Sequence, residues 1–198
     1  MNRNGSMHGE TKHVGEEQVE YEIIFGNETI VFLKTGAYGT VFGQENKYFY
    51  MAQDIHQRSG ATVICASNPD VSHEEIDEQE IRRVIKEMGI SHFTLHFIGV
   101  SDGAYHNLSL AKRFPQTVKM VGINSSYITV LGLQEKLLAL PNVCKVMIYG
   151  TKDDDFDEIV PALHEMTCDN LTIQYVEGAD HRFTGMVEEF IGLADYAL

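Results

Sequence analysis

The stretch from residue 93 to residue 111, FTLHFIGVSDGAYHNLSLA, has the pattern of a buried strand that runs directly into a helix. Residues 93–98 form a short apolar run of the kind typical of buried strands, and residues 104–114 carry apolar side chains at helical spacing. Between them stands Gly99-Val100-Ser101-Asp102-Gly103, a G-x-S-x-G sequence. On a sharp strand-to-helix turn the serine hydroxyl points out of the sheet, and small residues two positions to either side allow the bend. The pattern predicts an exposed nucleophile at Ser101, with an ordinary turn serine as the alternative.

Strand-like and helix-like segments alternate along the rest of the chain. Two alternating runs, 19–25 and 29–33, flank Gly26-Asn27 and predict a hairpin of two paired strands. Further apolar runs predict strands at 61–66, 118–123, 145–149 and 171–176, and helical spacing predicts helices at 45–58, 73–88, 156–166 and 183–197. This alternation indicates an α/β fold: a mostly parallel sheet of about seven strands with helices on both faces.

Length and composition favour one globular domain. The chain has 198 residues, of which 43% are hydrophobic and 22% charged. Residues 1–18 are polar and predict a flexible N-terminal tail, which leaves 19–198 as a single domain. The three cysteines are too few and too widely spaced for a disulfide framework, and no apolar run is long enough to cross a membrane. We therefore expect a cytoplasmic protein.

The charge balance narrows the classes of partner. Lys and Arg total 15 against 29 for Asp and Glu, which gives a formal net charge of -14. Such a surface repels phosphate backbones and anionic lipid headgroups, so we expect neither nucleic acid nor a membrane as a partner. The sequence leaves the oligomeric state open.

Polar residues follow two later strands of the predicted sheet. After the run 145–149 comes Gly150-Thr151-Lys152-Asp153-Asp154-Asp155, in which one carboxylate has the position to orient a histidine. A calcium loop is excluded there, because Glu158 stands where such a loop requires glycine. After the run 171–176 comes His181, the one histidine placed between a strand and a following helix. In an open α/β sheet the site lies at the carboxyl ends of the strands, so these residues and Ser101 are expected to meet.

The order serine, acid, histidine, each after a successive strand, resembles that of the α/β-hydrolase superfamily from about Ile30 onward. The resemblance implies a three-layer α/β-hydrolase-like sandwich. It also implies a catalytic triad of Ser101, His181 and Asp153, because the family's acid commonly falls three residues after the glycine that ends its strand. Asp154 is the alternative acid.

The resemblance also locates an oxyanion hole. Its first donor would be the backbone N–H of Asp102, the residue after the nucleophile. Its second would be the N–H of Ala37, with Gly36 as a near alternative, although this chain has Thr35-Gly36 where related families often have His-Gly. The glycines of this loop also suggest a dinucleotide-binding loop, but their spacing does not match G-x-G-x-x-G.

These features predict a serine hydrolase that cleaves a small carboxylic ester or thioester through an acyl-enzyme, without metal or cofactor. A non-catalytic small-molecule binding module and an acyltransferase are the alternatives. The segment between Ile123 and Lys145 is too short for a cap domain, so the pocket must be built from loops and should favour acyl chains of about C2 to C6. The candidate pocket residues besides Gly36 are aromatic side chains near strand ends: Tyr38, Tyr105, Tyr127, Phe156 and Phe183.

Overall fold

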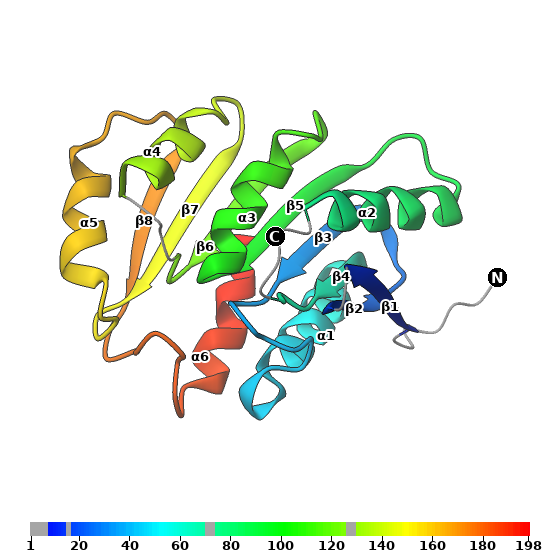
Figure 1. Cartoon of the computed structure of the whole chain (residues 1–198), viewed down its shortest axis with the longest axis horizontal. Helices are drawn as coiled ribbons and strands as arrows, with labels where there is room; N and C mark the ends of the chain where they lie inside the picture. Colours follow the sequence, from blue (N-terminus) through cyan, green and yellow to red (C-terminus); the bar gives the residue numbers. More distant parts are fainter. Residues whose placement is uncertain (1–7, 15–16, 70–73, 126–129) are drawn as a thin grey trace.

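The computed structural model describes residues 8–14, 17–69, 74–125 and 130–198. Its strands form one eight-stranded sheet with the order β1-β2-β4-β3-β5-β6-β7-β8 (Figure 1). The strands are β1 His8–Val14, β2 Glu17–Ile24, β3 Asn27–Lys34, β4 Ala61–Ala66, β5 Thr94–Val100, β6 Thr117–Ile123, β7 Cys144–Gly150 and β8 Leu171–Val176. Strands β3 to β8 run parallel, and β1 and β2 form an antiparallel edge. The prediction of a mostly parallel α/β sheet is confirmed.

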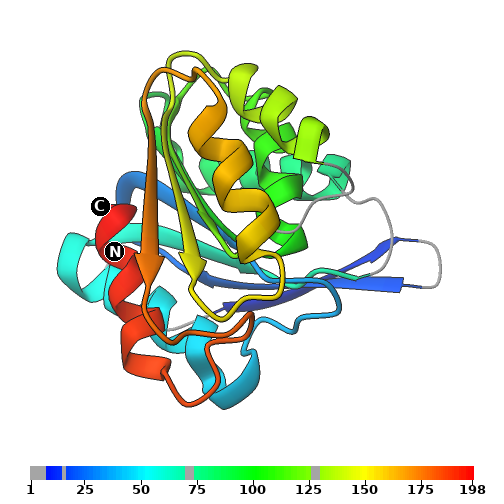
Figure 2. The ribbon, with the colours of Figure 1, turned by 90° about the vertical axis from the view of Figure 1, so that its left-hand side faces the viewer.

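Helices cover both faces of the sheet (Figure 2). They are α1 Lys47–Ser59, α2 Glu74–Met88, α3 Asp102–Ala111, α4 Val130–Leu138, α5 Phe156–Glu165 and α6 Val187–Gly192. Side chains of α2 to α5 belong to one hydrophobic core and those of α1 and α6 to the other. Strand β3 supplies both cores, because Ile30 and Phe32 face the first and Val31 and Leu33 the second, as the two-residue period of a strand requires.

The connection from β6 to β7 bears on access to the site. Within its described part it holds the short helix α4 and no inserted domain, which agrees with the expected capless fold. No helix in the described ranges has the length and hydropathy to span a membrane.

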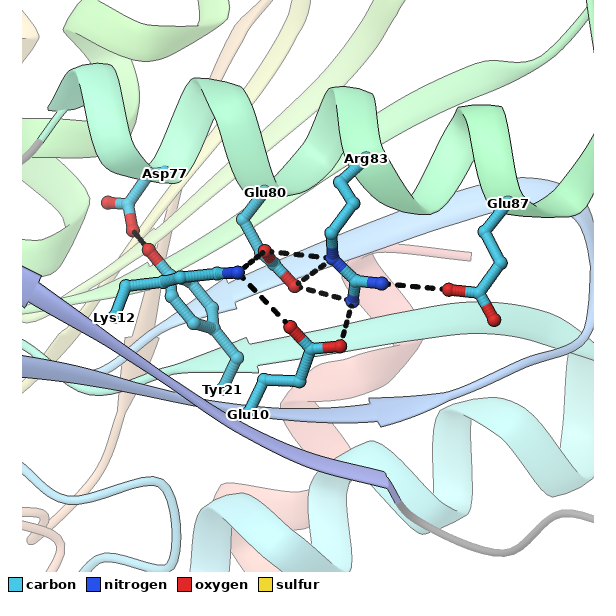
Figure 3. A network of polar contacts seen from close by, with 7 residues as sticks. All are labelled: Glu10, Lys12, Tyr21, Asp77, Glu80, Arg83 and Glu87. Carbon is cyan, nitrogen blue, oxygen red and sulfur yellow. Dashed lines mark hydrogen bonds and ion pairs between the residues drawn. The ribbon is translucent and has the colours of Figure 1, made fainter.

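The N-terminal tail expected over residues 1–18 is wrong for the part that the structure describes. Residues 8–14 form β1, which pairs with β2 from His8 opposite Ile23 to Val14 opposite Glu17. Strand β1 carries few apolar side chains, so its sequence lacks the alternation that marks a half-buried strand. Charged contacts with α2 accompany the backbone pairing, as Figure 3 shows: Glu10 pairs with Arg83 at 2.8 Å, and Lys12 lies 3.8 Å from Glu80.

The expected hairpin of residues 19–25 and 29–33 is also wrong, because β4 lies between β2 and β3. The Gly26-Asn27 pair crosses the start of β4, where the Asn27 N–H donates to Gly60 O at 2.7 Å. A Cβ on Gly26 would lie 2.1 Å from that same carbonyl oxygen. The glycine therefore permits a close backbone approach between chain segments that are distant in sequence. In the sequence alone, a glycine required for this reason looks the same as a glycine of a hairpin turn.

Candidate active site

Ser101 stands on a strained turn between β5 and α3. Its backbone lies at φ 53 and ψ -125, a region that residues with a Cβ rarely adopt. The turn is tight on both sides: a Cβ on Gly99 would lie 2.3 Å from Ala104 Cα, and one on Gly103 would lie 2.2 Å from Thr35 O. Both glycines of the G-x-S-x-G sequence are therefore required by backbone contacts, and the Ser101 N–H donates to Ile123 O on β6 at 2.8 Å.

The structure brings Ser101, His181 and Asp153 into one chain of hydrogen bonds. His181 Nε2 lies 2.9 Å from Ser101 Oγ, and His181 Nδ1 lies 2.7 Å from Asp153 Oδ2. The three residues follow β5, β8 and β7, so the sheet topology brings together side chains up to 80 positions apart in sequence. A proton on Nδ1 leaves Nε2 free to accept the serine proton.

The acid in contact with the histidine is Asp153, and the alternative Asp154 is exposed at the surface. The Asp153 side chain is buried, and its second oxygen, Oδ1, accepts the N–H of Asp155 at 3.0 Å. Both carboxylate oxygens therefore have partners, which fixes the direction in which Oδ2 faces the imidazole. Of the three adjacent aspartates, the sequence argument singled out the one whose geometry fits.

The charge environment favours the protonated histidine. The hydrogen bond that Asp153 accepts from His181 raises the pKa of the histidine, the negative charge of Asp153 acts in the same direction, and burial opposes the shift. Burial and the nearby Asp153 carboxylate raise the pKa of Asp155. A negative charge at Asp153 can therefore stabilise an imidazolium that forms during a reaction.

Two buried side chains that the sequence analysis did not single out hold the histidine loop. Asn124, after β6, donates from Nδ2 to the carbonyls of Asp180 and His181, each at 3.1 Å, and accepts the Gly150 N–H on Oδ1 at 2.8 Å. Lys47, in the first turn of α1, donates to the carbonyl of Arg182. Each of these residues has a signal in the sequence. Asn124 is a polar residue that follows a predicted strand, and Lys47 is a lysine on the apolar face of a predicted helix.

The loop after β3 lies against the serine. A Cβ on Gly36 would be 3.3 Å from Ser101 Cβ and 3.9 Å from Ser101 Oγ, so only a residue without a side chain leaves this space open. The Tyr38 and Gly39 N–H groups already donate, to Asn68 O and Gly36 O. Asp102 begins α3, and its carboxylate lies 3.0 Å from His106 Nε2 and 3.2 Å from Asn68 Nδ2. The expected oxyanion residues Ala37 and Asp102 thus lie on the two segments that meet at Ser101.

A cavity of about 590 Å³ opens beside Ser101 and His181. Of the predicted pocket residues, Gly36 and Tyr38 line it, together with Ala37. The sequence analysis missed further lining residues on the loop after β3, on α1 and beside the histidine: Thr40, Gln44, Lys47, Tyr48 and Arg182.

Three predicted pocket aromatics lie away from this cavity. Phe183 is 1% exposed and packs edge-on against Phe190 in the core under α1 and α6. Tyr105 and Phe156 pack against the core on the opposite face of the sheet. A residue that follows a strand is expected near the site, but this position does not determine the direction of its side chain. In these three residues the direction is set by packing of the rings against the hydrophobic cores. Tyr127 lies outside the described residues.

Comparisons with known proteins identify similar folds. No protein-family model matches the sequence, and no curated protein matches it either. An alpha-beta serine hydrolase homologue from Coxiella burnetii is 14% identical and superposes with a TM-score of 0.69, over 94% of this chain and 95% of that one. Est1E from Butyrivibrio proteoclasticus is 8% identical, with a TM-score of 0.70 over 94% and 95%. Dienelactone hydrolase from Anabaena variabilis is 16% identical, with a TM-score of 0.67 over 96% of each chain.

Proposed function

The chain has the α/β-hydrolase fold, and on that premise we propose that it is a serine hydrolase that cleaves a small carboxylic ester or thioester. One observation carries the proposal: a serine in a strained strand-to-helix turn lies 2.9 Å from a histidine whose other ring nitrogen lies 2.7 Å from a buried aspartate. This arrangement supplies a nucleophile, a general base and an orienting acid within hydrogen-bonding reach of one another.

In the first half of the reaction, Ser101 Oγ attacks the acyl carbon and its proton passes to His181 Nε2. The carboxylate of Asp153 stabilises the resulting imidazolium through its contact with Nδ1. Negative charge develops on the carbonyl oxygen, where the backbone N–H groups of Asp102 and Ala37 are the proposed donors. The tetrahedral intermediate collapses when His181 returns the proton to the departing alcohol or thiol, which leaves an acyl group on Ser101.

In the second half, water replaces the alcohol or thiol. His181 accepts a proton from the water as its oxygen attacks the acyl carbon, and then returns that proton to Ser101 Oγ as the carboxylic acid leaves. The absence of a cap in the described connection between β6 and β7 supports an open site for small acyl groups.

A fluorophosphonate probe tests the proposal, because it reacts with serines that a neighbouring base activates. Wild type and a Ser91→Ala control, which alters an exposed serine before β5, should be labelled at one residue, and Ser101→Ala should not be labelled. Ser101→Ala should also lower kcat on p-nitrophenyl acetate by at least ~10³-fold while circular dichroism shows the fold intact. Labelling that persists in Ser101→Ala, or no labelling of folded wild type, would overturn the proposal.

A further inference from the structure

The cavity beside Ser101 has an unusual charge for this protein. The chain carries a formal net charge of -14, yet no Asp or Glu is among the described residues that line the cavity. Besides His181, the charged residues that line it are two cations, Lys47 and Arg182. An acidic protein therefore presents a cationic wall at its candidate reaction site.

Arg182 differs from the other arginines in the described ranges. Each of those makes an ion pair with at least one carboxylate: Arg58 with Asp54, Arg82 and Arg113 with Glu78, and Arg83 with Glu80. The Arg182 guanidinium has no carboxylate within ion-pair distance in that part of the chain. Its nearest acidic neighbour in sequence is Asp180, whose Oδ1 accepts the backbone N–H groups of Arg182 and Thr184. A guanidinium is a planar fork of donors that suits a carboxylate, so this one is available to a bound anion.

Lys47 adds a second positive charge that is largely shielded from water. It is 5% exposed, and its ammonium lies 4.6 Å from the centre of the Phe190 ring. Of the three donors that an ammonium carries, one has a hydrogen-bond acceptor among the described residues, the carbonyl of Arg182. Burial lowers the pKa of Lys47, and the negative charges of Asp180 and Glu45 act in the opposite direction. The hydrogen bond from the Lys47 ammonium to the Arg182 carbonyl also holds the backbone of Arg182 at the cavity.

We propose that the cavity binds esters or thioesters that carry a carboxylate in addition to the bond that is cleaved, with Arg182 as the residue that pairs with that carboxylate. This inference rests on the proposed hydrolase function and defines its substrate class. Lys47 contributes positive electrostatic potential from the cavity wall. The protein as a whole carries a negative net charge, so the cavity differs from it in the sign of the charges that line it. Arg182 is exposed, so water screens its charge, and an ion pair with a bound carboxylate should change substrate preference by ~3 to 10-fold.

Two esters of equal acyl length test the proposal: p-nitrophenyl butyrate and mono-p-nitrophenyl succinate, which carries a carboxylate in place of the terminal methyl group. The measured quantity is the ratio of kcat/KM for the succinate ester to that for the butyrate ester. Arg182→Gln should lower this ratio by ~3 to 10-fold, and Arg182→Lys should lower it less, because it keeps the charge but not the fork.

The matched control is Lys86→Gln, which removes one positive charge from the exposed last turn of α2. Helix α2 ends just before β5 begins, so this position lies at the opposite end of the sheet from the cavity. The control should leave the ratio unchanged. A ratio that stays within ~2-fold of wild type in Arg182→Gln would overturn the inference.

A binding measurement separates this inference from the proposed function. Monomethyl succinate and methyl butyrate are titrated into Ser101→Ala and into Ser101→Ala/Arg182→Gln, with binding followed by NMR. Ser101→Ala should bind monomethyl succinate more tightly than methyl butyrate, and the second substitution should remove that difference. Binding without any dependence on charge would overturn the substrate class even if wild type hydrolyses esters. Charge-dependent binding by Ser101→Ala, together with a wild type that hydrolyses no ester, would overturn the hydrolase function alone.

Discussion

Asp153→Asn tests the assignment of the acid through two hydrogen bonds that one carboxylate makes. Asp153 Oδ1 accepts the N–H of Asp155 at 3.0 Å, and Oδ2 faces His181 Nδ1 at 2.7 Å. Asparagine has nearly the same shape but replaces one oxygen with an NH₂ group, which donates hydrogen bonds and accepts none. Either orientation of the amide therefore loses one of the two contacts.

The structure indicates which orientation is favoured. If the amide oxygen faces His181, the NH₂ group meets the Asp155 N–H, and leaving those buried donors unpaired costs about 1 to 3 kcal/mol. If the oxygen instead keeps the Asp155 N–H, the NH₂ group donates to Nδ1 and the proton of the imidazole moves to Nε2. In that tautomer Nε2 cannot accept the proton of Ser101. The corresponding change in a serine protease lowers kcat by ~10⁴-fold, and we expect a loss of ~10³ to 10⁴-fold here.

The assay compares kcat on p-nitrophenyl acetate for Asp153→Asn and Asp154→Asn, two variants that lose the same charge from adjacent positions. Asp154 is exposed, so its variant should stay within ~2-fold of wild type, as is typical of surface changes. Equal losses in the two variants, or a larger loss in Asp154→Asn, would refute the assignment of Asp153.

Three further predictions concern pH, substrate length and stability. The hydrogen bond to Asp153 raises the pKa of His181, and the protonated ring cannot act as a base. The value of kcat/KM should therefore fall as the pH decreases, with its midpoint above the ordinary histidine pKa of ~6.5. A midpoint below that value would contradict the contact. Across p-nitrophenyl esters from acetate to palmitate, kcat/KM should be highest at about C2 to C6, whereas a maximum at about C12 or longer would reveal a deep acyl tunnel. Asp77→Ala removes the carboxylate that lies 2.9 Å from the buried Lys34 ammonium. Urea denaturation should therefore show a free energy of unfolding that is lower by ~3 to 5 kcal/mol than that of wild type. A loss below ~1 kcal/mol would mean that Lys34 finds another partner.

The parallel part of the sheet could be predicted because its strands are buried on both faces. Strand β4, for example, has six buried residues in succession, a pattern visible as the apolar run 61–66. The antiparallel edge could not be predicted in the same way, because β1 is stabilised by pairing with β2 and by contacts with Arg83 and Glu80 of α2. Those contacts join segments distant in sequence, and local periodicity does not report them.

The rule that a site lies at the carboxyl ends of parallel strands located the three loops of the hydrogen-bonded chain, and the family resemblance singled out Asp153 among its neighbours. Ser101 directly follows β5, and Asp153 and His181 lie in the loops that follow β7 and β8, so the topology brings all three to one edge of the sheet. The same rule failed for Phe183, because its ring packs on Phe190 instead of facing the cavity. Its residue type explains the difference: at a strand end an apolar ring gains from burial, whereas a polar group must find a partner.

Asn124 extends that argument to a residue that is not among those lining the cavity beside Ser101. It follows β6, as Ser101 follows β5, but its side chain is 1% exposed, so every polar atom of its amide needs a partner within the protein. The amide meets this need by joining the end of β7, through the Gly150 N–H, to the carbonyls of Asp180 and His181. Its φ of 44 suits asparagine, which tolerates the left-handed region better than most residues. The distance between the acid and the histidine therefore depends on a side chain that contacts the backbone of the two loops, and not the Asp153 carboxylate or the His181 ring.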